Sequence, residues 1–262
     1  IDVGTNPKLR QEMVAAALAG GKHVVNQLPF AMDSVAGQTM LDQARAAKRV
    51  GVVAASVVGL PQLRMMKRMI EDGALGEIFQ VHCHWQLGYF NPVLPNFSYV
   101  WFGEQGRGVS VLRNQGSHIL HALLELFGPI SGVMGETRTF TPRWEIAPGE
   151  FKDNQTDDTM SALLRFESGA LGTMSTSWVA SASPGFWIEA FGRNGHLKLV
   201  SKSYPNPETA HLYYGKPNYE IVPTAREVSI PDALFEVDGR CVSIEGLSQV
   251  LSMARIFESS RA

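Results

Sequence analysis

An alternation of helical and strand patterns over the first 75 residues constrains the fold of this chain more than any other feature. Helical periodicity over 8–19 precedes a short strand at 23–26, and a second helix to about residue 48 precedes the valine-rich run 50–58. Pro61 then begins a third helix. A continuous apolar run is typical of a strand that is covered on both faces in a parallel sheet. The alternation predicts an α/β region over 1–75 built on a doubly wound sheet.

The pattern changes after Gly76. Residues 77–86 predict a strand, residues 112–127 contain a helix, and 244–259 predict a final amphipathic helix. Hairpin strands are expected over 159–166, 170–178, 186–193 and 196–200, with a further strand over 227–230. This order predicts an α+β domain over 76–262 with a large antiparallel sheet, and a domain boundary near Leu75.

Charge and cysteine content exclude several classes of protein. A net charge of −2 supplies no basic excess for contacts with phosphates, so nucleic acid is not an expected partner. The longest apolar run, 50–60, falls short of the roughly 20 residues that a membrane helix needs, and no membrane partner is expected. Two cysteines are too few for a disulfide framework or a cysteine-type zinc site. We therefore expect a cytoplasmic protein.

Four short segments carry motifs whose order and spacing are informative. They are Thr5-Asn6-Pro7, GKHVVNQLP over 21–29, GALGEI over 73–78 and NQGSH over 114–118. In this order they resemble the T-P turn, the G-K-H-V-x-x-E-K-P strand and turn, the G-x-L-G-x-I link between domains and the D-x-G-x-H helix start of the Gfo/Idh/MocA oxidoreductases. Residues 257–260 also resemble the closing helix of that family.

The resemblance implies an enzyme that moves a hydride between NAD or NADP and a carbinol carbon of a sugar, a cyclitol or a related polyol. It implies that residues 1–75 are the C-terminal part of a Rossmann-like nucleotide-binding domain, a partial doubly wound sheet, and that an α+β domain follows whose sheet covers the active site. It places cofactor contacts at Thr5, Asn6, Gln27, Leu28 and Pro29.

The dinucleotide fingerprint of such a domain is missing. A G-x-G-x-x-G motif normally follows the first strand and holds the cofactor pyrophosphate at a helix N-terminus. No such motif occurs in the chain. We therefore expect an N-terminally truncated sequence, in which the first strand–helix units and most of the cofactor contacts precede Ile1.

Two departures from the family pattern bear on catalysis. Gln27 and Leu28 stand where the family carries Glu-Lys, and Asn114 stands where it carries Asp. Gln27 can still hydrogen-bond towards the nicotinamide ribose, whereas Leu28 removes the cation that would polarise the substrate oxygen. Losing such a group typically costs on the order of 10²–10³ in rate. An alternative therefore stays open: a non-catalytic regulator that senses a sugar or a nucleotide.

His118 is the main catalytic candidate, and Asn114 is the second. Histidine is suited to take a hydroxyl proton while hydride leaves the same carbon, because its pKa lies near neutrality. The alternative is a histidine packed at the start of a helix. Asn114 lies one helical turn before His118, where it can orient the imidazole or cap the helix as an N-cap residue.

Other polar residues admit a structural interpretation as readily as a functional one. Arg113 can hold an acidic group or be solvated, Asp157 and Asp158 are expected in a solvated turn, and His121 can line the same cleft as His118. A pair of histidines alternates on one strand, but no third metal ligand is identifiable, so no metal site is expected. The pair is His82 and His84.

An aromatic cluster and a sheet face complete the predictions. The cluster can stack on a sugar ring or form core and subunit contacts, and packing is favoured. Its members are Trp85, Tyr89, Phe90, Phe97, Tyr99, Trp101 and Phe102. We also expect the open face of the second-domain sheet to form a homo-oligomer. The apolar candidates for this contact are Met160, Leu163, Leu171, Met174 and Trp178.

Overall fold

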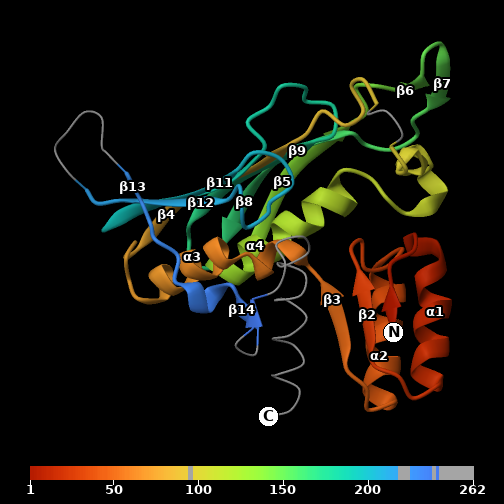
Figure 1. The fold of residues 1–262 in the computed structure, drawn as a ribbon, viewed down its shortest axis with the longest axis horizontal. Coiled ribbons are helices and arrows are strands. Elements are labelled where there is room, and N and C mark those ends of the chain that lie inside the picture. Colours follow the sequence, from red (N-terminus) through yellow and green to blue (C-terminus); the bar gives the residue numbers. More distant parts are fainter. Residues whose placement is uncertain (94–96, 218–224, 238–239, 242–262) are drawn as a thin grey trace.

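Two sheets of unequal size organise the molecule (Figure 1). The computed structural model describes residues 1–93, 97–217, 225–237 and 240–241. The smaller sheet is parallel, in the order β1-β2-β3, and we call residues 1–54 the small lobe and the described residues from 56 onward the large lobe. The elements of the small lobe are β1 (Asp2–Val3), α1 (Pro7–Ala19), β2 (Val24–Gln27), α2 (Ser34–Ala46) and β3 (Gly51–Ala54).

Apolar residues from both helices and the strands between them hold the small lobe together. Val14 and Leu18 of α1 pack with Val24 of β2 and Met40 of α2, so both helices cover the same face of the sheet. Asp33 caps α2, because its carboxylate accepts a hydrogen bond from the backbone N–H of Ala36 at 2.8 Å. The predicted α/β region is therefore present.

The valine-rich run 50–58 forms a shorter strand than its composition predicts. β3 ends at Ala54, and a 3₁₀ turn over Ser56–Gly59 follows. Val57 is buried in the core of the large lobe, not in that of the small one. Both halves of the run carry apolar residues because the two halves are buried in different cores.

The larger sheet has eight strands in the order β13-β12-β11-β10-β4-β9-β8-β5. All neighbours are antiparallel except β4 and β9, so the sheet is mixed where an antiparallel sheet was predicted. The parallel pair arises because β4 lies between two hairpins and joins β9 on one side and β10 on the other. The strands are β4 (Ile78–Gln86), β5 (Ile130–Arg138), β8 (Thr159–Phe166), β9 (Leu171–Ser177), β10 (Phe186–Gly192), β11 (Gly195–Ser201), β12 (His211–Gly215) and β13 (Arg226–Glu227).

Helices α3 (Pro61–Glu71) and α4 (Ser117–Phe127) lie against one face of this sheet (Figure 1). The buried apolar side chains of both helices pack against inward-facing strand residues; they are Leu63 and Met66 of α3 and Ile119 and Leu123 of α4. Helix α3 packs in the core of the large lobe. The predicted domain boundary near Leu75 would instead place α3 in the first domain, and that boundary remains a prediction.

Shorter elements complete the described chain. Short 3₁₀ helices cover Val100–Gly103, Gln105–Arg107 and Asp232–Leu234, and one turn of π-helix over Leu112–Gly116 leads into α4. Small hairpins are formed by β6 (Arg143–Ala147) with β7 (Glu150–Asp153), and by β14 (Glu236–Val237) with β15 (Arg240–Cys241). Of the strand predicted over 227–230, only Glu227 lies in a strand, β13, and residues 228–230 form none. The helix predicted over 244–259 lies outside the described residues.

Three sequence-based expectations about surface residues are wrong. Asp158 is fully buried, not solvated: its carboxylate accepts hydrogen bonds from the backbone N–H groups of Phe140 (3.0 Å) and Thr141 (2.7 Å). Arg113 is half-buried and paired, not free in solvent or for a substrate, because it donates to the carbonyl oxygens of Ala31 (2.8 Å) and Met32 (2.5 Å) across the lobes.

The third correction concerns the apolar residues expected on the open face of the large sheet. Met160, Met174 and Trp178 are buried on the helix-covered side. Side chains alternate along a strand, so residues an odd number of positions apart point to opposite faces. Leu163 and Leu171 do lie on the open face, at 57% and 55% exposure.

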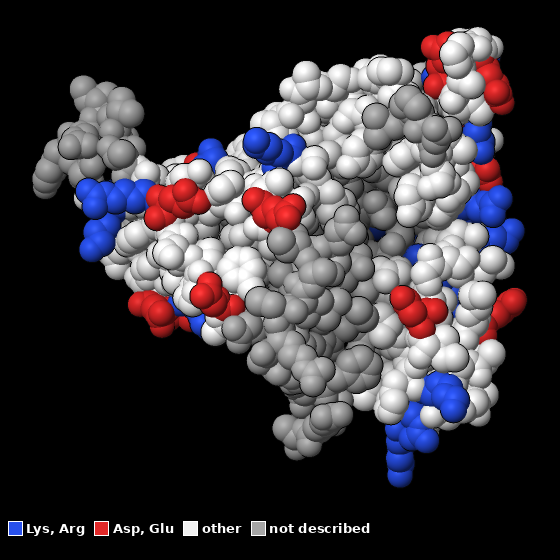
Figure 2. Space-filling model, in the orientation of Figure 1, with Lys and Arg blue, Asp and Glu red and all other residues white. Residues whose placement is uncertain are grey.

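On the face shown in Figure 2, acidic and basic side chains of the described residues are interspersed and form no large patch of one charge. None of the helices in this part of the chain combines the length and the apolar character needed to cross a membrane.

Candidate functional site

A cavity of about 660 Å³ opens where the two lobes meet. Six of its lining residues come from the small lobe and the remainder from the large lobe, so that neither lobe alone forms it. The lining residues are Gly4, Thr5, Arg10, Gln27, Leu28, Pro29, Trp85, Leu87, Tyr89, Phe90, Phe97, Tyr99, Trp101, Phe102, Val109, Asn114, Gln115, His118, Trp178 and Tyr204.

Four of the five predicted cofactor residues line this cavity. Thr5 follows the C-terminal end of β1, and Gln27, Leu28 and Pro29 lie at the C-terminal end of β2. Ligands of open α/β sheets bind beyond the carboxyl ends of the strands, so this edge of the small lobe suits a nucleotide. The fifth residue, Asn6, precedes α1 and does not line the cavity; its Oδ1 atom is buried without a partner among the described residues.

Arg10 holds this edge in place and was not anticipated from the sequence. Its guanidinium donates to the carbonyl oxygens of Thr5 (Nε, 2.7 Å), Gln27 (Nη1, 2.5 Å) and Pro29 (Nη1). Burial lowers the pKa of Arg10 to about 10, and Asp2 opposes this shift, so the side chain stays charged at neutral pH. A signal was available: Arg10 shares the buried face of α1 with Val14 at helical spacing, where an arginine needs partners.

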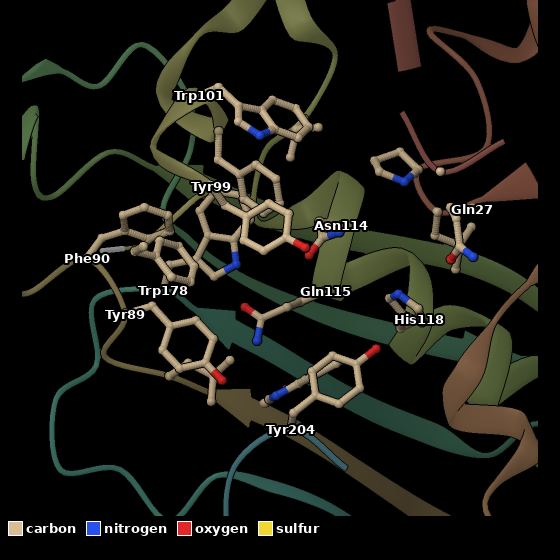
Figure 3. Close-up of a pocket in the computed structure, with 18 of the residues that line it drawn as sticks. Gln27, Tyr89, Phe90, Tyr99, Trp101, Asn114, Gln115, His118, Trp178 and Tyr204 are labelled. Atoms are coloured by element: carbon tan, nitrogen blue, oxygen red, sulfur yellow. The ribbon is translucent and has the colours of Figure 1, made fainter. Parts of the chain in front are cut away.

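His118 lies in the first turn of α4, on the large-lobe side of the cavity (Figure 3). It is 7% exposed, and its Nδ1 atom is buried without a hydrogen-bond partner in the described part of the chain. Burial, with a smaller contribution from the charge of His121, lowers the pKa of His118 to about 4. The imidazole is therefore neutral at physiological pH and has a free site for a proton, but as a base it is weaker than an ordinary histidine, whose pKa lies near neutrality.

Asn114 also lines the cavity, but it does not cap α4. The residue that precedes α4 is Gly116, and no side-chain hydrogen bond caps that end. Asn114 lies in the π-helical turn, where its backbone carbonyl accepts from the Ser117 hydroxyl at 2.8 Å. The N-cap alternative is therefore wrong, and the side chain of Asn114 belongs to the cavity wall.

Two further polar residues line the cavity without having been predicted. Gln115 accepts a hydrogen bond from Thr176 at 3.2 Å, and its Nε2 atom is buried without a partner in the described structure. The Tyr204 hydroxyl lies 2.8 Å from the Ser56 hydroxyl, and burial raises the pKa of Tyr204. Gln115 lies inside the NQGSH motif, which is a usable signal; Tyr204 is far away in sequence and gives none.

The aromatic cluster forms one wall of the cavity and is also packed internally. All seven predicted members line the cavity, together with Trp178. Phe90 stacks on Trp144 with 3.8 Å between ring centroids and is 2% exposed, whereas Tyr99 remains 48% exposed. The inner rings therefore serve the core, and the outer rings present aromatic surface.

The remaining histidine candidates lie elsewhere. His82 and His84 are on the open face of the large sheet, where their Nδ1 atoms lie 2.6 Å from the hydroxyls of Thr173 and Ser175. Among the described residues, no three His, Cys, Asp or Glu side chains come together as a metal site. His121 contacts the Ser117 carbonyl through Nδ1 (2.9 Å) and does not line the cavity.

Two known proteins with similar sequences are named as carbohydrate dehydrogenases. Levoglucosan dehydrogenase of Pseudarthrobacter phenanthrenivorans is 24% identical over 211 residues, which are 75% of this chain and 51% of that protein. D-xylose dehydrogenase of Paenarthrobacter nicotinovorans is 25% identical over 183 residues, 65% of this chain and 45% of that protein. The chain thus spans about half the length of these curated relatives.

Solved structures share the fold. Levoglucosan dehydrogenase in complex with NADH and L-sorbose matches with a TM-score of 0.83 at 20% identity, over 98% of this chain and 69% of that one. An inositol dehydrogenase homologue from Azotobacter vinelandii, complexed with NADH and myo-inositol, matches with a TM-score of 0.76 at 22% identity, over 99% and 66% of the two chains.

The family model of the GFO/IDH/MocA C-terminal domain matches residues 63–198, which include β4, α4 and the whole aromatic wall. The match covers more than half of the chain, and the order of the two sheets agrees with it. This chain belongs to the Gfo/Idh/MocA family of oxidoreductases.

Proposed function

We propose that this chain carries the substrate site of an NAD(P)-dependent oxidoreductase, which transfers a hydride to or from a carbinol carbon of a sugar, a cyclitol or a related polyol. The observation that carries the proposal is a neutral, buried His118 in a cavity that also contains Gln27 from the opposite lobe (Figure 3). The named activities of the relatives, on levoglucosan and on D-xylose, support it.

The small-lobe side of the cavity fits the nicotinamide end of the cofactor. The Thr5 hydroxyl and the Gln27 amide offer hydrogen bonds to ribose or carboxamide groups, and Leu28 and Pro29 offer apolar contact to a ring. Arg10 fixes the backbone that presents them. The NADH in solved relatives supports this assignment. When bound, NAD(P) supplies the hydride acceptor or donor.

His118 then handles the proton of the reacting hydroxyl. A neutral imidazole accepts the proton as the carbinol becomes a carbonyl and returns it in the reverse direction. Its unpartnered Nδ1 and the unpartnered Nε2 of Gln115 are buried polar atoms that a hydroxylated substrate can satisfy. Asn114 offers an amide for a neighbouring hydroxyl.

Turnover by the full-length protein tests the proposal. We expect reduction of NAD⁺ or NADP⁺ with at least one member of a polyol panel, and a loss of about 10²–10⁴ in kcat for His118→Ala. His121→Ala is the matched control, because His121 lies on the same helix outside the cavity. Unchanged turnover in the His118 variant would sink the assignment.

A non-catalytic sensor of sugar or nucleotide is the second candidate, and one observation favours it. Leu28 lines the cavity where the family carries lysine, and Arg10, the one Lys or Arg among the described lining residues, donates to backbone carbonyls. Binding of cofactor and polyol without any NAD(P) reduction would favour this candidate over the enzyme.

We also propose a cytoplasmic homo-oligomer that forms through the open face of the large sheet. Met134, Leu163 and Leu171 lie on this face of β5, β8 and β9 and are 73%, 57% and 55% exposed. Neighbouring exposed apolar side chains of this size are typical of a protein interface.

A further inference from the structure

The cavity has two chemically different ends. Gln27 and His118 lie together on one side of the view in Figure 3, and Phe90 and Trp178 lie on the other. Asn114, Gln115 and Tyr204 add an amide, a second amide and a hydroxyl between them. A ligand that fills the cavity therefore meets hydrogen-bonding groups at one end and ring faces at the other.

The described lining contains no charged group that is free to pair with a ligand. Arg10 is held by three backbone carbonyls, and His118 is neutral because its pKa lies near 4. No aspartate, glutamate or lysine occurs among the described residues that line the cavity. A phosphate or a carboxylate bound here would lose its hydration without gaining a counter-ion, which is strongly unfavourable.

The aromatic end offers ring surface beyond what the core uses. Phe90 and Trp178 are 2% exposed and pack on each other, with 5.5 Å between centroids. Tyr99 contacts Phe97 and Phe102 at 5.4 and 5.1 Å, yet nearly half of it remains exposed. An added ring would continue this edge-to-face stacking and bury the Tyr99 surface.

We propose that the substrate is an uncharged two-part molecule: a polyhydroxylated ring that carries the reacting carbinol, joined to an apolar or aromatic ring. The hydroxylated ring lies at the His118 end, and the apolar ring lies against Tyr99 and Trp101. The cavity of about 660 Å³, which in the proposed function also receives the nicotinamide end of the cofactor at Leu28 and Pro29, is within the size range of small-molecule sites. This inference rests on the proposed function, because it takes His118 as the reacting end.

Binding to matched glycosides tests the inference without requiring turnover. The probes are phenyl and methyl β-glycosides of glucose, galactose and xylose, together with phenyl β-glucuronide, measured by calorimetry on the full-length protein. We expect at least one phenyl glycoside to bind about tenfold more tightly than its methyl partner, because stacking adds to the burial of the ring. Phenyl β-glucuronide, which is charged, should bind about tenfold more weakly than phenyl β-glucoside or worse.

Variants identify the surface that is responsible. Trp101→Ala should reduce the phenyl-to-methyl affinity ratio towards one, whereas Phe140→Ala should leave it unchanged, because Phe140 is 68% exposed and lies outside the cavity. Equal affinity of phenyl and methyl partners, preference for the glucuronide, or no measurable phenyl glycoside binding would each overturn the inference.

The two proposals fail separately in this design. Preference for a neutral phenyl glycoside without NAD(P) reduction upholds the substrate class and rejects the enzyme. NAD(P) reduction by a free polyol, with no preference for phenyl over methyl glycosides, upholds the enzyme and rejects the substrate class.

Discussion

At the scale of the residue, the burial of His118 makes stability depend on pH. The pKa of His118 falls from 6.5 to about 4 on folding. Between these values the unfolded chain binds a proton that the folded protein does not, so the free energy of unfolding decreases as pH falls from 6.5 towards 4. Protonation therefore lowers the free energy of unfolding by on the order of 3 kcal/mol in total once the pH is below about 4. Above pH 6.5 this loss is absent and the protein keeps its full stability.

His118→Asn should remove most of this pH dependence. Urea unfolding of the two proteins, compared between about pH 5 and about pH 7, measures the difference. His121→Asn is the control: desolvation is the larger cause of the His118 shift, so most of the slope should persist without His121. An equally steep slope in the His118 variant would contradict the assignment.

Leu28 is the second residue whose identity can be tested directly. Leu28→Lys places an ammonium group in the cavity wall, where it can polarise a substrate oxygen; we expect kcat/KM for polyols to rise by about 10²-fold. Stability should fall, because Leu28 is 7% exposed and a buried lysine is poorly solvated. Steady-state kinetics measure the gain, and Leu28→Met, which adds no charge, should show none. A folded lysine variant without a gain would refute the prediction.

At the scale of the element, Arg10 joins the first turn of α1 to the loops that follow β1 and β2. Arg10→Met leaves the carbonyls of Thr5, Gln27 and Pro29 without their donor, and we expect a loss of about 3 kcal/mol or more in the free energy of unfolding. Cofactor affinity should fall as well, because the same loops line the cavity.

Arg49→Met is the matched control for Arg10, because Arg49 donates to the Gly21 carbonyl at 2.7 Å from an exposed position. It should cost under about 1 kcal/mol, because water can replace an exposed donor. Denaturant unfolding of both variants measures the contrast, and equal losses would show that burial of the Arg10 contacts does not matter.

Local patterns predicted most elements but not every partner of a strand. The hairpins β8–β9 and β10–β11 follow from alternation and from turn residues such as Asn194 and Gly195, which are near neighbours in sequence. The parallel pairing of β4 with β9 joins residues about 90 positions apart and has no local signal. Asp158 was mistaken for a turn residue for a similar reason, since the N–H groups that it binds belong to a distant segment.

At the scale of the whole molecule, the open face of the large sheet is the surface that assembly would use. Leu163→Glu introduces a charge on this face without disturbing the core, since Leu163 is 57% exposed. We expect light scattering to show a shift from oligomer to monomer. Leu124→Glu is the control on the outside of α4, at 46% exposure, and should leave the mass unchanged. A wild-type monomer would reject assembly through this face.

The sequence by itself indicated an α/β region followed by a larger sheet, the family and several of the residues that line the cavity, because motifs and periodicity are local properties of a chain. Thr5, Gln27, Leu28, Pro29, Asn114 and His118 were all identified in this way. Only the tertiary structure decided what surrounds them. It supplied the Arg10 contacts with backbone carbonyls, the burial that keeps His118 neutral, and the hydrogen bond between the Tyr204 and Ser56 hydroxyls of two distant segments. Burial and long-range hydrogen bonds depend on which segments meet in space, and local patterns do not contain that information.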